Sequence, residues 1–465
     1  MIDAESLSCP VVVPGDAEYD QLRHVWNADI DRRPAAIARC STPEQVAEVL
    51  RWARATGTPI TVRGGGHNLA GTAVADGAVQ IDTRPMNSVV VDQVAGTVTV
   101  GAGCVWGEVD RAVEDLGVAV PAGVVSHTGV AGLTLGGGFG YLTRMHGATV
   151  DHLVSAQIVV ADGRILTVSD EENPDLFWAI KGAGHNYGVA TSFTYRYVTL
   201  PGLATVRTSL YAAADRRAMM ERFRDVAIGL PANVGTYLRV YRCPAYWSQV
   251  PAEHRDTPIL SLSTVTYGDA SGVAEKALFD GTNPIYTSVR TIPHVTLQHS
   301  TDDEFRYGIR HYWRHTFVHE LSGEAIDTIL HWADAYPGRS LNSSAFISHQ
   351  VMCPFEMIAG SDQERDGSRD ALPSHGPMRY SANIGADWEF PAEKAPLVGW
   401  VRGFSDAMRP FQGGTYINFT SVQGDDAVAK AVYGDKYERL TTVKKQYDPD
   451  NVFSRGLVDL SKDDA

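Results

Sequence analysis

Hydrophobic and polar positions in the first 120 residues predict two helices separated by short strands. Apolar residues recur at helical spacing between Ser41 and Gly57, with Thr42 as the N-terminal cap and Pro43 in the first turn. The β-prone run 59–62 follows this helix and predicts a strand. Further short strands are expected at 78–82, 88–92 and 97–103, and a second helix at 105–116.

Between about 150 and 200 the pattern predicts further strands, two of them joined by a tight turn, and one more helix. Two apolar runs within 153–168 flank Asp162-Gly163, a dipeptide typical of a two-residue hairpin. Asn173-Pro174 opens another helix, and 189–198 alternates in the manner of a strand. Leu200-Pro201-Gly202 is the best candidate for a domain boundary.

The region from about 203 to 410 has a different hydrophobic pattern, in which alternating runs are interleaved with long helical stretches. This pattern predicts a large antiparallel sheet covered by helices. The last segment is expected to return with a strand at Tyr416 and then a helix through Leu440, which Asp448-Pro449 ends. The alternating runs lie at 205–211, 235–241, 259–267, 345–351 and 379–384, and the clearest helix at 322–336. The expected domains are 1–201, 202–412 and 413–465.

Composition excludes several classes of partner. The 465-residue chain has 40 Lys and Arg against 55 Asp and Glu, a formal charge of -15, which argues against a surface for nucleic acid or an anionic membrane. The five cysteines form no CxxC pair and no metal-binding spacing, which favours a reducing cytoplasm. No basic signal segment and no apolar run near the ~18 residues of a membrane helix is present, so a soluble, cytoplasmic protein is expected.

Two glycine-rich loops carry the strongest chemical signal. Arg63-Gly64-Gly65-Gly66-His67 comes directly after a predicted strand, and glycines there let backbone N–H groups approach a phosphate. An isolated run of three glycines is more often a surface turn. A second glycine-rich loop at 129–140 makes a binding site the better interpretation, since a ligand with two phosphates and a ring system needs more than one loop. Neither loop has the G-x-G-x-x-G spacing of a nicotinamide-binding unit.

Several longer segments resemble one family, the FAD-linked oxidases of the vanillyl-alcohol oxidase and p-cresol methylhydroxylase superfamily, and within it the berberine-bridge-enzyme-like branch. The single-anchor pattern described below is similar to that of bacterial members that tailor natural products in secondary metabolism. The matching segments are RGGGHN at 63–68, PAGVVSHTGVAGLTLGGGFGYLTRMHG at 121–147, LVSAQIVVADGRILT at 153–167, NPDLFWAIKGAGHNYGV at 173–189, YINF at 416–419 and KQYDPDNVF at 445–453.

The resemblance implies an α+β fold with a two-part FAD-binding domain, formed by the first and last segments, and a substrate domain between them. His67 occupies the position that bonds covalently to the flavin, a role for which a neutral imidazole is suited. The aligned position of the family's second anchor is Val125, so linkage through His67 only is expected. The other expected FAD contacts are Arg63, Gly64, Gly65, Gly66, Asn68, Asn87, Ser126, His127, Gly129, Gly136, Gly137, Gly138, Gly140, Gly188, Val189 and Asn418.

The resemblance also places Tyr416 where relatives have a catalytic base that accepts the substrate's hydroxyl proton. An aromatic wall of the pocket is the alternative interpretation. Relatives often continue this motif with a tyrosine and an aspartate, whereas this chain has Phe419-Thr420-Ser421. Tyr141 and His146 are further catalytic candidates near the flavin-facing loop, and His349 is a weaker one.

The expected function is an oxidase that takes hydride from a small organic molecule and passes the electrons to O2. An FAD dehydrogenase with another acceptor and an oxygenase or cyclase that remodels a natural-product scaffold are the enzyme alternatives, and a flavin-binding carrier is the non-enzyme one. Expected partners are the small-molecule substrate and O2, without nucleic acid or membrane. The chain is expected to be a monomer or a homodimer.

Overall fold

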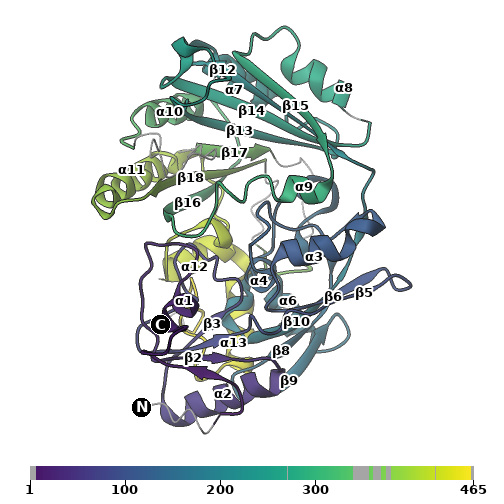
Figure 1. Ribbon diagram of the computed structural model, residues 1–465, viewed down its shortest axis with the longest axis vertical. Coiled ribbons are helices and arrows are strands. Elements are labelled where there is room, and N and C mark those ends of the chain that lie inside the picture. Colours follow the sequence, from purple (N-terminus) through teal and green to yellow (C-terminus); the bar gives the residue numbers. More distant parts are fainter. Residues whose placement is uncertain are drawn as a thin grey trace.

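The computed structural model describes residues 7–269, 271–338, 355–359, 368–372, 379–424 and 426–461. These residues form two parts that lie one above the other in Figure 1. The upper part, which we call the cap, runs from strand β12 (Ala204–Ala212) through helix α11 (Lys394–Ala407). The lower part, the base, contains the chain before β12 and after α11. The expected strand at 345–351, with His349, lies outside the described residues.

The base is built on two sheets. In the first, in the order β1-β2-β4-β3, β1 is antiparallel to β2 and the other pairs are parallel. The second, in the order β5-β6-β10-β8-β9, is antiparallel throughout. Their strands are β1 (Val11–Val12), β2 (Ala36–Arg39), β3 (Ile60–Arg63), β4 (Val79–Asp82), β5 (Val89–Asp92), β6 (Thr97–Gly101), β8 (Leu153–Val159), β9 (Ile165–Ser169) and β10 (Val189–Arg196). The short β7 (Val118–Ala119) and β11 (Val198–Thr199) form a separate pair.

Helix α2 (Pro43–Thr56) follows the sequence signals at both of its ends. The Thr42 hydroxyl accepts a hydrogen bond from the backbone N–H of Gln45 at 3.3 Å, and Gly57 ends the helix with a φ of 65°. Its apolar face, which includes Val46, packs into the core over the first sheet. The other helices of the base are α1 (Tyr19–Arg23), α3 (Trp106–Val113), α4 (Val130–Leu135), α5 (Thr143–His146), α6 (Pro174–Ala183), α12 (Asp426–Tyr433) and α13 (Tyr437–Tyr447).

The cap contains a seven-stranded antiparallel sheet in the order β15-β12-β14-β13-β17-β18-β16. Helices α7, α8, α10 and α11 pack on this sheet, which confirms the expected large antiparallel sheet covered by helices. The remaining strands are β13 (Val234–Arg242), β14 (Pro258–Tyr267), β15 (Tyr286–Ile292), β16 (Arg310–Val318), β17 (Phe355–Ala359) and β18 (Tyr380–Trp388). The remaining helices are α7 (Arg216–Val226), α8 (Ser271–Ala274), α9 (His294–Gln298) and α10 (Gly323–Asp334).

The expectation of a strand at Tyr416 is wrong. The chain forms a single 3-10 turn there, at Ile417–Phe419. Segment 412–421 does run along the edge strand β16, since Gly413 donates to the Phe317 carbonyl at 2.7 Å and Ser421 to the Trp313 carbonyl at 3.0 Å. Between these contacts the Tyr416 N–H donates to a histidine side chain rather than to a strand, so no ladder forms.

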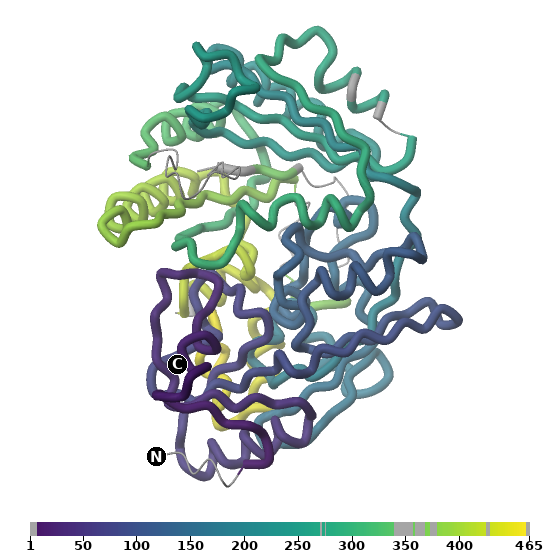
Figure 2. The backbone as a smooth tube through the Cα atoms, in the orientation of Figure 1, coloured from purple at the N-terminus to yellow at the C-terminus, as the bar shows by residue number. Residues whose placement is uncertain are grey.

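The two ends of the chain lie together in the base, where the yellow C-terminal segment runs beside the purple and blue N-terminal one (Figure 2). Helix α13 packs on α6, and Arg54 of α2 forms an ion pair with Asp450. The buried Lys444 ammonium contacts the Asp448 carboxylate at 2.6 Å and the Asn186 carbonyl at 2.8 Å. The last segment is therefore an integral part of the base.

Two further kinds of feature are absent from the described residues. Within them, no helix is long and apolar enough to cross a membrane. The same residues contain no group of three or more His, Cys, Asp or Glu side chains placed to hold a metal ion.

Candidate active site

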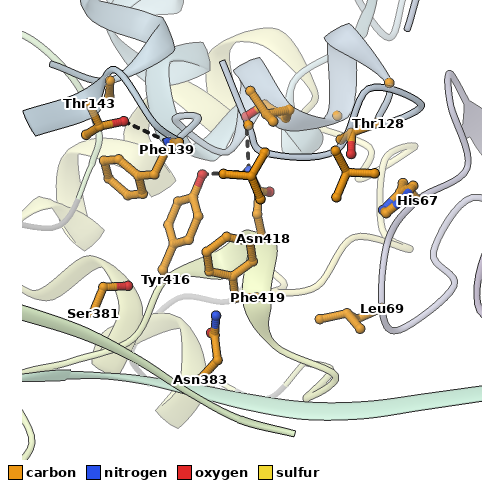
Figure 3. A pocket seen from close by; sticks show the side chains of 18 of the residues that line it. His67, Leu69, Thr128, Phe139, Thr143, Ser381, Asn383, Tyr416, Asn418 and Phe419 are labelled. Carbon is orange, nitrogen blue, oxygen red and sulfur yellow. Dashed lines mark hydrogen bonds between the residues drawn. The ribbon is translucent and has the colours of Figure 1, made fainter. Parts of the chain in front are cut away.

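A cavity of about 830 Å³ lies between the glycine-rich loops of the base and the sheet of the cap. The base supplies segments 62–73 and 123–151 to its lining, and β16 and β18 supply part of the cap side. Residues 416–419 complete the lining from the C-terminal segment. Figure 3 shows these contributions, with His67 at one end and Tyr416 near the middle.

The two glycine-rich loops touch each other backbone to backbone at one side of the cavity. A Cβ atom added to Gly65 would lie 2.5 Å from the Cα atom of Gly129, a distance that real Cβ atoms do not tolerate. Gly66, with a φ of 68°, then turns the chain towards His67. The result is a stretch of cavity wall made of backbone without side chains, which a diphosphate and a flat ring system can approach closely.

His67 is held by ring contacts on two sides. Its imidazole stacks on the Trp26 indole with ring centroids 4.2 Å apart, and its Nε2 atom lies 3.2 Å from Nδ1 of His127. Burial, followed by the nearby charges of His127 and His311, lowers the pKa of His67 well below its ordinary value. The imidazole is therefore neutral at physiological pH, as a nucleophile must be.

Trp26 was not among the residues expected from the sequence, although it lies at the centre of this arrangement. The face of its indole that points away from His67 stacks on His311 of β16, with centroids 3.9 Å apart. The next residue, Asn27, donates from its side chain to the carbonyls of Leu69 at 2.7 Å and His311 at 2.9 Å. The Trp26-Asn27 pair therefore joins the His67 loop to the cap.

The phenol oxygen of Tyr416 accepts two hydrogen bonds. The donors are the backbone N–H of Gly138 and the side-chain amide of Asn418, both at 2.8 Å. Asn418 fits closely over Gly136, where an added Cβ would lie 2.1 Å from its Oδ1 atom. Two N–H donors aimed at one oxygen stabilise negative charge on it, which is the electrostatic requirement for a phenol that takes up and releases a proton.

A neutral histidine of the cap fixes the backbone of Tyr416. Nδ1 of His315 accepts a hydrogen bond from the Tyr416 N–H at 2.8 Å, so the proton of this imidazole is on Nε2. Nε2 lies 2.9 Å from the hydroxyl oxygen of Ser381 on β18 and donates to it. Sequence reasoning missed His315, because nothing in the alternation of β16 separates a positioning histidine from an ordinary buried one.

The other two catalytic candidates also line the cavity. The ring of Tyr141 meets that of Tyr237 edge to face at 5.7 Å. Burial, and secondarily the charge of His152, lowers the pKa of His146. Nε2 of His146 is buried and has no hydrogen-bond partner among the described residues.

The expected cofactor residues divide into two groups. Gly64, Gly65, Gly66, His67, Asn68, Gly129, Gly140 and Asn418 line the cavity. Arg63, Asn87, Ser126, His127, Gly136, Gly137, Gly138, Gly188 and Val189 lie outside its lining.

Several residues of the second group have other neighbours. Asn87 is exposed, and Val189 lies in the core of the base. Ser126 donates to Asp302 from both its backbone N–H, at 2.9 Å, and its hydroxyl, at 2.6 Å, and so ties the residues just before the second loop to the segment after α9. His185, which was not expected, does line the cavity, and burial lowers its pKa to about 4.

Comparisons with known proteins agree on the type of protein. Residues 34–169 match the family model of an FAD binding domain, and residues 415–455 match the model described as berberine and berberine like. The (R)-6-hydroxynicotine oxidase of Paenarthrobacter nicotinovorans is 27% identical, over 96% of this chain and 96% of that protein. An FAD-linked oxidoreductase of Bacillus subtilis, YgaK, described as uncharacterized, is 28% identical over 97% of each chain.

Solved structures match the fold over almost the whole length. The crystal structure of 6-hydroxy-D-nicotine oxidase from Arthrobacter nicotinovorans superposes with a TM-score of 0.84 at 23% identity and covers 98% of this chain and 99% of that one. The berberine-bridge-like enzyme 1 of Physcomitrella patens has the same TM-score at 22% identity, with 99% and 98% covered. At this level of identity the likeness concerns the fold alone.

Proposed function

Because this chain is an FAD-linked oxidoreductase with an FAD-binding domain and a berberine-like C-terminal segment, we propose that it holds FAD covalently through His67 and oxidises a small organic molecule. FAD accepts a hydride from the substrate, and O2 is the proposed final electron acceptor. The other steps fall to the side chains around the cavity.

One observation carries the proposal. The contact between Gly65 and Gly129 leaves bare backbone along one wall of the cavity, with a neutral His67 at its end and the Tyr416 phenol farther along. The cavity therefore offers, in order, a surface for phosphates, a nucleophile for attachment and an acid–base group. A flavin is long enough to use all three.

For His67 we propose attachment at the nitrogen that His127 does not contact. The Nε2 of His67 faces Nδ1 of His127 at 3.2 Å, and this contact leaves the other ring nitrogen as the nucleophile. Val125, which lines the cavity, has no thiol to offer for a second link. A single covalent bond follows from this.

For Tyr416 we propose the role of the base that takes the substrate's hydroxyl proton as hydride leaves. The N–H donors of Gly138 and Asn418 stabilise the phenolate, and His315 holds the backbone in place. His146 and Tyr141 then shape the substrate end of the cavity.

The setting of the enzyme is part of the same proposal. The described cysteines, Cys9, Cys40, Cys104 and Cys243, are buried free thiols, which supports a reducing cytoplasm. We further propose a monomer or a homodimer that meets its small-molecule substrate and O2 by diffusion and that acts in natural-product tailoring.

The test is the visible spectrum and the intact mass of the purified protein before and after acid denaturation. A mass increase of one FAD that persists in acid supports covalent attachment, and His67→Ala should release yellow flavin into the acid supernatant or lose it altogether. His24→Ala, at an exposed position, is the matched control and should keep the bound flavin. A colourless wild-type protein with the apoprotein mass would contradict the proposal.

Hydrogen peroxide formed in step with substrate oxidation separates an oxidase from a dehydrogenase. Incorporation of labelled oxygen from O2 into the product would instead favour the oxygenase.

A further inference from the structure

Trp313 forms a fixed aromatic wall on the cap side of the cavity. It lies on β16 directly opposite Gly385 of β18, where an added Cβ would come within 2.9 Å of its Cδ1 atom. The indole N–H donates to the Asp387 carboxylate at 2.7 Å, and the Phe305 ring meets the indole edge to face at 5.7 Å. The glycine makes room for the indole and the aspartate sets its orientation.

Asn383 is the polar group beside this wall. It lies two residues before Gly385 on the same face of β18, and its side chain points into the cavity towards Phe419 (Figure 3). Its Oδ1 atom is buried and has no hydrogen-bond partner among the described residues. A buried amide oxygen without a partner is unfavourable, and because this oxygen can only accept, a ligand that offers a hydrogen-bond donor relieves this.

The charged groups of the lining are already occupied. Asp151 accepts from the Ala148 N–H at 2.7 Å, and Arg144 donates to the carbonyls of Ile228 and Leu230. The other three charged side chains of the lining have partners as well. Glu304 forms an ion pair with Arg239, and the Asp387 carboxylate accepts hydrogen bonds from Trp313 and His311. Arg369 also has an interaction partner. A charged substrate would therefore be desolvated without a counter-charge, which is strongly unfavourable.

We propose that β16 and β18 form a subsite for a neutral, flat, unsaturated ring that carries a hydroxyl group, which donates to Oδ1 of Asn383. The ring stacks against Trp313, and its polar group bonds to the Asn383 amide. This subsite deepens the proposed function, on which it rests, by naming the class of substrate. A sugar fits less well, because its ring presents hydroxyls on every side, whereas Phe139, Phe305, Phe317 and Phe419 line the cavity together with Trp313.

Four probes test the subsite in the flavin-loaded wild-type protein, through the change in flavin absorbance on titration. 2-Naphthol, neutral at pH 7, has the proposed features; naphthalene lacks the hydroxyl, 2-naphthoate is charged and cellobiose is a carbohydrate. We expect 2-naphthol to bind about 3- to 10-fold more tightly than naphthalene, the range for one hydrogen bond. 2-Naphthoate and cellobiose should bind more weakly than either.

Two variants assign the contacts. Asn383→Leu should remove the preference for 2-naphthol over naphthalene, and Trp313→Leu should weaken both by about 3- to 10-fold or more through lost stacking. Asn233→Leu and Trp247→Leu replace residues of the same types outside the cavity lining and should leave both affinities unchanged. If Asn383→Leu does not load flavin, Asn383→Ser allows the same measurement with a smaller side chain.

The outcomes separate the subsite from the function on which it rests. A yellow protein that binds 2-naphthoate or cellobiose as tightly as 2-naphthol would overturn the subsite and leave the flavoenzyme intact. A preference for 2-naphthol that survives in both Asn383 variants would also overturn it. A protein without flavin would overturn the proposed function instead.

Discussion

The side-chain amide of Asn418 donates a hydrogen bond to the phenol oxygen of Tyr416, two residues earlier, at 2.8 Å. The same nitrogen donates to the carbonyl of Leu133 at 3.0 Å, which sets the orientation of the amide. Leu133 lies in helix α4, within the second glycine-rich segment (129–140), so Asn418 connects the phenol to a segment that lines the cavity. The C-terminal segment therefore contributes both the proposed base and the group that holds it.

Tyr416→Phe should slow flavin reduction by about 100- to 1,000-fold, in the range by which general acid–base catalysis contributes. The flavin content should stay unchanged, because His67 and the glycine loops are untouched. Rapid mixing with substrate without oxygen measures the rate, and acid precipitation measures the flavin. Tyr433→Phe removes another buried hydroxyl, which donates to the Gly182 carbonyl outside the cavity lining, and should leave the rate intact. Equal rates for the two variants would count against Tyr416 as the base.

Gly65→Ala should abolish flavin loading. The new methyl group would lie 2.5 Å from both the Cα and the N atoms of Gly129, so the two loops must separate. The ratio of flavin to protein absorbance measures the effect. Gly399→Ala in helix α11, where nothing lies within 4 Å of the added carbon, should load flavin normally and gain up to about 1 kcal/mol of stability. Normal loading of Gly65→Ala would show that close contact of the loops is dispensable.

Lys444→Met should reduce the free energy of unfolding by about 3–5 kcal/mol, the usual effect of leaving one member of a buried ion pair without its partner. Lys444 and Asp448 are 1% and 0% exposed, and the Asp448 carboxylate also accepts from the N–H groups of Val452 and Phe453. Urea unfolding provides the measurement. Arg409→Met breaks the exposed pair with Asp406 and should change stability by less than about 1 kcal/mol. Similar effects of the two substitutions would mean that the buried pair contributes little.

Asp110→Asn should be more stable than the wild type at pH 8 and equally stable near pH 4. Burial raises the pKa of Asp110 to about 7, and the charges of Asp302 and Glu114 act in the same direction. Since this value exceeds the ~4 of an unfolded chain, the wild type loses stability as pH rises from about 4 to about 7, by up to about 4 kcal/mol. Asparagine cannot ionise and avoids this loss.

Melting temperatures of both proteins across this pH range check the sign of the Asp110 effect. Curves that stay parallel would show that Asp110 ionises in the folded protein without the proposed penalty.

Much of the fold could be predicted from local signals. The Thr42 cap and the Gly57 stop of α2, and the Asp162-Gly163 turn between β8 and β9, lie where the sequence placed them. These features depend on neighbours in the chain, so a single sequence contains them. The strand expected at Tyr416 failed because its backbone donor is taken by His315, a residue 101 positions away.

Some residues of the candidate site can likewise be predicted from the sequence, and others cannot. The glycine-rich loops and His67 are visible as continuous motifs. Trp26 and Asn383 become candidates only when the fold brings them to the cavity, because a lone tryptophan in a connecting segment and a lone asparagine in an alternating strand have no local signature.

The order of the lining segments along the chain has a consequence for biosynthesis. The lining of the cavity is formed by the loop at 63–68, by strands β16 and β18, and by the segment around the 3-10 turn at 417–419. The buried ion pair of Lys444 and Asp448, which stabilises the base, comes later still in the chain. While a ribosome is still translating the cap, the future cavity lacks both the Trp26–His311 stack and the amide of Asn418. We therefore expect flavin to bind a nearly finished chain, and the proposed attachment at His67 to follow folding rather than to precede it.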